Sequence, residues 1–262
     1  MVVLNTMPGA GLIQGAVHPV PIRRGWLFIA TGGVLLWRAA AFRWPSALVP
    51  IPEDLRLPLL LLGVLFLLCG VWAYWARPDR WTTVFLVYAL GGGVHWGGAI
   101  GAPQAGLELS FLFVYLGLSA LGEAALLHLA LIYPKNGPLA QRWRGALYAP
   151  AALALLVAAV AGFLPQAILR TMAGSLFLVA SLLGLVAGFL FLVRLFTVER
   201  AVRRAARLPH IVGGLVVGGG LELLGTTGVL PGHPGAWSLL LGLIPISLAI
   251  ALVSQSLETS NA

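Results

Sequence analysis

The stretch Leu57-Pro58-Leu59-Leu60-Leu61-Leu62 begins an apolar run that continues to residue 76. A bilayer hydrocarbon core takes about 20 helical residues to cross, so this run is long enough to span it. Lipid offers no partner to a backbone N–H, and the run lacks the alternation of a barrel strand, so a helix is expected. Eight such runs can be recognised, at 25–41, 57–76, 81–101, 109–133, 145–164, 172–196, 210–230 and 236–254. The sequence therefore predicts an all-α, polytopic membrane bundle of about eight transmembrane helices.

The composition supports a membrane protein. Hydrophobic residues make up 60% of the 262 and charged residues 9%, and the mean hydropathy is +0.96, far from soluble domains. We expect one membrane domain at 25–254, between cytoplasmic tails at 1–24 and 255–262. An alternative remains open, in which Arg23-Arg24, the first run and Ala39-Ala40-Ala41 form a cleavable leader. The lone Cys69 excludes an internal disulfide.

The positive charge is distributed unevenly along the chain. If the N-terminus is cytoplasmic, 12 of the 16 Lys and Arg residues fall on the inner side and 4 on the outer side. This bias is typical of proteins of the cell's inner (plasma) membrane and places both termini in the cytoplasm. The net charge of +8 therefore indicates orientation and contact with anionic lipid, not binding of nucleic acid.

A basic segment follows the sixth run on the inner side. Its arginines lie close to helical spacing, which predicts that it extends the sixth helix or lies in the interface against anionic headgroups. The arginines are Arg194, Arg200, Arg203, Arg204 and Arg207.

Glycine clusters predict where helices approach closely. Gly91, Gly92 and Gly93 lie in the third run, and Gly214 and Gly218 have the small-residue spacing in the seventh. We expect both helices in the bundle interior, where they could pack against each other.

Four ionisable residues fall within predicted spans, where such groups are costly and are therefore functional candidates. Helical rise places His95, Glu123 and Glu222 within about 9 Å of depth, so they could share a pocket that holds a proton or a cationic ligand. The alternative is that each only hydrogen-bonds a neighbouring helix. His128 lies about 16 Å from His95 in depth, so the two cannot be the axial ligands of one haem.

No motif for catalysis stands out. Serines lack a Gly-x-Ser-x-Gly context and His-Glu-x-x-His is absent, so no enzymatic activity and no metal site are predicted. No cofactor is predicted either, although a single axial ligand from His95 or His128 stays open.

Four segments resemble, in the matching order, the multi-pass N-terminal sensor region of bacterial histidine kinases, which also precedes serine phosphatases and diguanylate cyclases. His128-Leu129-Ala130-Leu131-Ile132-Tyr133-Pro134 is similar to that family's His-x-x-Leu-x-Phe-Pro exit, with Tyr133 for the usual Phe. The other segments are Arg77-Pro78-Asp79-Arg80, Glu199-Arg200-Ala201-Val202-Arg203-Arg204-Ala205 and Leu243-Ile244-Pro245-Ile246-Ser247-Leu248-Ala249-Ile250-Ala251. The resemblance carries over His128 and Pro134 as motif positions and defines no ligand residues.

The resemblance implies a membrane sensor that lacks the family's catalytic domain. Such a protein would bind a small or lipophilic signal, or the helices of a partner, and relay it through the basic segment to a separate membrane or cytoplasmic protein. Two other functions are also compatible with the sequence. The chain could be an accessory subunit of a respiratory or photosynthetic complex, or a small proton-coupled transporter that uses Glu123 and Glu222.

Overall fold

The computed structural model describes residues 53–97, 106–134, 138–226, 228–229 and 234–259. Within these ranges every regular element is helical, which confirms the predicted all-α class. The α-helices are α2 (Glu53–Ala76), α3 (Arg80–Gly97), α4 (Gly106–Ile132), α5 (Pro138–Leu147), α6 (Ala149–Val160), α7 (Gln166–Thr197), α8 (Arg200–Ala205), α9 (Leu208–Thr226), α10 (Pro234–Leu239) and α11 (Leu243–Thr259). Short 3-10 turns, η1 (Ala161–Phe163) and η2 (Leu240–Gly242), follow α6 and α10.

Six of the described segments are long and apolar enough to cross a membrane. They are Leu57–Ala76, Leu112–Ile132, Arg142–Phe163, Gln166–Thr197, Leu208–Gly225 and Trp237–Ser254. The third predicted span corresponds to α3, which is not among the six, and the first predicted span at 25–41 lies outside the described residues. The number of eight spans and the orientation of the termini stay predictions.

Several boundaries differ from those expected from the sequence, two of them near the basic segment and its helix. α7 starts at Gln166, six residues before the predicted span, because extended Pro165 precedes a helix that continues through Arg170. The basic segment does not extend this helix, because Val198 and Glu199 are extended and α8 is a separate turn of helix. The sequence also did not predict α5, which begins before the predicted run at 145–164.

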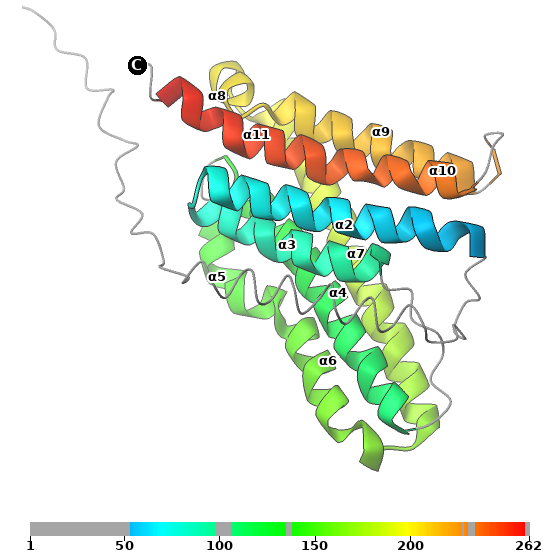
Figure 1. Ribbon diagram of the computed structural model, residues 1–262. Helices are drawn as coiled ribbons and strands as arrows, with labels where there is room; N and C mark the ends of the chain where they lie inside the picture. Colours follow the sequence, from blue (N-terminus) through cyan, green and yellow to red (C-terminus); the bar gives the residue numbers. More distant parts are fainter. Residues whose placement is uncertain (1–52, 98–105, 135–137, 227, 230–233, 260–262) are drawn as a thin grey trace, which may run out of the picture.

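The helices form two groups (Figure 1). α2, α3, α9 and α11 run roughly alongside one another, whereas α4, α6 and α7 run steeply away from them. α3 packs on both α2 and α4, α4 packs on α6 and α7, and α11 packs on α9 and α2. α4 therefore links the two groups.

The glycine clusters mark close approaches, but the two predicted partners do not face each other. A side-chain carbon on Gly91 would lie 2.6 Å from the Gly122 nitrogen of α4, and one on Gly93 would lie 2.8 Å from Leu67 of α2. Gly214 lies against Ser247 of α11, and a side-chain carbon on Gly218 would meet the Leu240 carbonyl at 2.8 Å. The expected contact of the third and seventh spans is thus wrong: each packs on a neighbour of its own.

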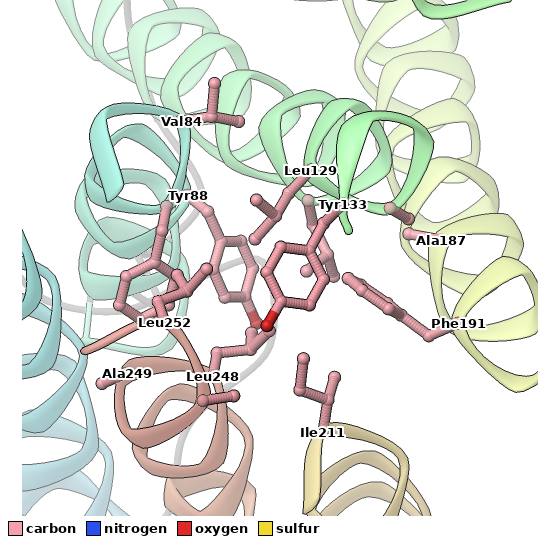
Figure 2. Packing of buried hydrophobic residues seen from close by; sticks show 14 of the residues in the cluster. Val84, Tyr88, Leu129, Tyr133, Ala187, Phe191, Ile211, Leu248, Ala249 and Leu252 are labelled. Carbon is pink, nitrogen blue, oxygen red and sulfur yellow. The ribbon is translucent and has the colours of Figure 1, made fainter. Parts of the chain in front are cut away.

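The largest buried cluster lies where the two groups meet. Figure 2 shows its side chains pointing toward one another from α3, α4, α7, α9 and α11. Labelled members include Tyr88, Leu129, Tyr133, Phe191, Ile211 and Leu248. A second cluster, around Phe113 and Leu169, joins α4, α6 and α7 near the beginning of α4.

Candidate functional site

Tyr133, the first residue after α4, connects several helices at one end of the bundle. Its side chain is fully buried, and its hydroxyl donates a 2.6 Å hydrogen bond to the carbonyl of Ala206 at the end of α8. Its ring meets that of Trp81 on α3 edge to face, with centroids 5.4 Å apart. We call the cluster of Arg77, Trp81, Tyr133, Arg194 and Ala206 the Tyr133 junction.

Arg194 joins the end of α7 to the end of α4. Its Nη2 donates a 2.7 Å hydrogen bond to the Leu131 carbonyl, and its Nη1 donates to the carbonyl of Tyr133. Carbonyls in the last turn of a helix have no intrahelical donor, and a basic side chain there also complements the helix dipole. Arg194 therefore caps α4 from a neighbouring helix, so a movement of α7 would disturb the C-terminal end of α4.

Arg77 connects the turn after α2 with the last helix. Its Nε lies 2.7 Å from the Asp79 carboxylate, its guanidinium lies 5.3 Å from the centre of the Trp81 ring, and its Nη1 donates to the Leu252 carbonyl at 3.3 Å. Asp79 in turn accepts a 2.9 Å hydrogen bond from the Thr82 backbone N–H, which caps the start of α3.

The junction brings together the segments on which the sequence resemblance rests. Arg77 belongs to the first segment, Tyr133 to the second, and Ala206 directly follows the third. Leu252 directly follows the fourth. Their order along the chain was visible in the sequence, but their contacts were not, because they are separated by up to 175 residues.

Of the basic segment, only part is engaged. Arg203 donates a 2.8 Å hydrogen bond to the Leu195 carbonyl at the end of α7, and so fixes α8 to that helix. Arg200 and Arg204 are exposed, as are Arg142 and Arg144 on α5. These exposed arginines make this end of the bundle positively charged.

The motif position His128 makes a packing contact close to the junction. Its Nδ1 lies 2.9 Å from the hydroxyl of Tyr148, which precedes α6, and the rings meet edge to face at 5.8 Å. The residue is 2% exposed, and its Nε2 has no hydrogen-bond partner among the residues that the structure describes. His128 therefore holds the end of α4 against the start of α6, while Pro134 follows Tyr133 through a cis peptide bond.

His95 lies in a different place, between α3, α4 and α7. Its Nδ1 is 2.6 Å from the Ser119 hydroxyl, and the Tyr115 hydroxyl donates a 3.0 Å hydrogen bond to the His95 carbonyl. Its ring is stacked with those of Tyr115 and Phe177, at 6.2 and 6.5 Å. The residue is thus held by contacts from two neighbouring helices.

Glu123 follows Ser119 by four residues on α4, which places it on the same side of the helix about 6 Å farther along. Its carboxylate lies against Gly184 of α7, where a side-chain carbon would stand 3.1 Å from the Glu123 Cδ and closer still to one of its oxygens. His95 and Glu123 therefore both lie where α3, α4 and α7 meet. We call the set of His95, Ser119, Glu123 and Gly184 the polar seam.

Glu222, the third residue of the predicted pocket, is carried by α9 and is partly buried. α9 packs mainly on α11 and only in part on α7. The structure thus brings His95 and Glu123 together along one seam and places Glu222 in another pair of helices. Sequence reasoning missed Ser119 and Gly184, although the spacing Gly184-x-x-x-Gly188 was a visible signal of close approach.

Among the described residues, no group of three or more His, Cys, Asp or Glu side chains is arranged to hold a metal ion. Comparison of the chain with protein-family models, with curated proteins and with solved structures finds no match.

Proposed function

We propose that this chain is a multi-pass membrane protein of sensor-region type, without catalytic activity of its own, that relays a membrane signal to a separate protein. The observation that carries the proposal is the Tyr133 junction. There the ends of α3, α4, α7 and α8 are joined by directional bonds, and Arg77 adds the last helix. A change in packing within the bundle would therefore reach α8 and its exposed arginines.

The proposal includes eight spans in the inner membrane with both termini in the cytoplasm. The distribution of Lys and Arg supports this orientation. The Tyr133 junction further supports this orientation. The helix ends that meet there are all ends that the charge distribution assigns to the cytoplasm. Reporter fusions placed after residues 45, 104, 137 and 207 test the orientation: cytoplasmic activity is expected at the last two and not at the first two.

A relay of this kind needs two arrangements of the bundle whose balance a signal shifts. The junction consists of a small number of hydrogen bonds and ring contacts, which suits a contact that can be exchanged as a unit. The family resemblance gives the class of receiver: a protein with a histidine kinase, serine phosphatase or diguanylate cyclase domain.

The deciding experiment is mild extraction of the full chain from its native membrane, followed by mass spectrometry of the proteins that stay bound in stoichiometric amounts. A catalytic protein of the three named classes is expected. Replacement of Arg200 and Arg204 by Gln should weaken its retention, whereas replacement of the outer-side Arg170, which is also exposed, should not. Recovery of the subunits of an electron-transfer complex instead would reject the sensor function in favour of an accessory subunit.

A further inference from the structure

We propose that the polar seam binds a lipophilic ammonium ion, with the Glu123 carboxylate as its counter-charge, and that Gly184 of α7 leaves space for this carboxylate. The inference rests on the proposed function and names the chemical class of its signal. It concerns a part of the molecule that the Tyr133 junction does not use.

The first argument concerns the charge of Glu123. A carboxylate in an apolar interior is costly unless a cation or a hydrogen-bond donor accompanies it. In the described part of the chain no ion pair involves Glu123. The carboxylate lies about 3 Å from the centre of its predicted span. A cation supplied by a ligand would restore the balance of charge.

The second argument concerns the surroundings of the carboxylate. Tyr88 on α3 is buried close to Glu123, whereas Tyr115 and Phe177 stack on His95 about two turns farther along the seam. A carboxylate with a tyrosine ring beside it suits an ammonium group, because the ring attracts a cation while accommodating its alkyl substituents.

The third argument concerns access and shape. Glu123 is partly exposed, and on α7 the nearby Ser181 and Leu185 are exposed. Because Gly184 has no side chain, α7 lies directly against the carboxylate, whereas one turn later a side-chain carbon on Gly188 would meet nothing within 4 Å. A ligand that reaches this depth must first dissolve in the bilayer, so an alkylammonium ion is a better candidate than a hydrophilic amine.

The test uses the full chain in phosphatidylcholine nanodiscs and a photoreactive dodecylamine that carries a diazirine on its alkyl chain. Labelled peptides are identified by mass spectrometry, with dodecylamine and the neutral dodecanol as competitors. We expect labelling of α4 and α7, and at least tenfold stronger competition by the amine, since a charge-assisted contact in an apolar site contributes about this much. Equal competition by dodecanol, or labelling confined to other helices, would overturn the inference.

Two pairs of variants locate the site. Glu123→Gln should lower amine affinity about tenfold or more, whereas Glu123→Asp, which keeps the charge, should retain most of it. Gly184→Ala should weaken binding because its new methyl group meets the carboxylate, and the matched Gly188→Ala should not. If Glu123→Gln does not fold, the glycine pair decides. Loss of labelling in Glu222→Gln with full labelling in Glu123→Gln would also reject the site.

The outcome can be separated from that of the proposed function. If the amine fails to bind while a kinase, phosphatase or cyclase still co-purifies, the sensor function stands and only its ligand class is wrong. If the amine binds but the chain co-purifies with subunits of an electron-transfer complex, the seam is a ligand site in a protein of another role.

Discussion

α4 and α7 are both long membrane helices that lie side by side, yet they meet opposite environments. In the most apolar part of α4, 72% of the residues are buried inside the protein, whereas the corresponding share of α7 is 22%. The less buried helix is the more apolar of the two. α4 contributes Ser119, Glu123 and His128 to the interior, while α7 presents Phe177, Leu185 and Phe189 at its surface.

The difference shows that the more hydrophobic residues of these two helices are not the more buried ones, as they would be in a soluble domain. Lipid is as apolar as a leucine side chain, so an exposed Phe on α7 loses nothing by remaining outside. Helix association instead depends on close packing and on hydrogen bonds, which explains why polar side chains of α4 lie in the interior. Four predictions examine this contrast, from the largest expected effect to the smallest.

The largest effect is expected at the contact between α3 and α4. Gly91→Leu should destabilise the protein by about 3 kcal/mol or more, because its side chain would enter the backbone of Gly122 and force the helices apart. The free energy of unfolding is measured by titration from mild detergent into SDS. Gly188→Leu on α7, where a side chain meets open space, should change it by less than about 0.5 kcal/mol. Similar losses in both variants would contradict the contrast.

Two phenylalanines provide the second comparison. Phe113 on α4 is 0% exposed and Phe189 on α7 is 63% exposed. Phe113→Ala should cost about 2 kcal/mol, less than in a soluble core because only packing is lost and not transfer from water. Phe189→Ala should be nearly neutral in the same titration. A cost at Phe189 that matches Phe113 would indicate that α7 is covered by a partner in the membrane.

The third prediction concerns Arg194, through which α7 supplies a polar contact to the end of α4. Arg194→Met should destabilise the protein by about 2 kcal/mol, because the carbonyls of Leu131 and Tyr133 at the end of α4 lose a charged donor. Hydrogen exchange of the last turn of α4 should increase at the same time. Arg200→Met, on the exposed side of α8, is the control and should leave that turn protected.

The smallest effect is expected from the Tyr133 hydroxyl. Tyr133→Phe retains the ring against Trp81 and removes only the hydrogen bond to Ala206, so a loss of about 1 kcal/mol is expected. The stability of Tyr133→Phe combined with Arg194→Met measures whether the two contacts act together. Strict additivity would mean that the junction consists of independent contacts and would weaken its proposed role as a unit.

The local sequence determined the class of the fold and the places of the helices. Because lipid cannot satisfy a backbone N–H, a long apolar run in this chain has to form a helix, and no distant residue can change that. The same reasoning identified Gly91 and Gly214 as points of close approach and His95 and Glu123 as residues of the interior. It missed α5, whose short amphipathic helix lacks a long apolar run.

Only the tertiary structure decided which surfaces meet. Gly91 lies against Gly122 and not against Gly214. Glu123 lies against Gly184, apart from the α9–α11 pair that carries Glu222. Tyr133 bonds to Ala206, which is 73 positions away in the sequence. The helical period predicts the depth of each residue and the side of the helix on which it lies. Which other helix packs against that side depends on the packing of the whole bundle. That choice follows from packing and from a few long-range hydrogen bonds, for which this chain contains no local signal.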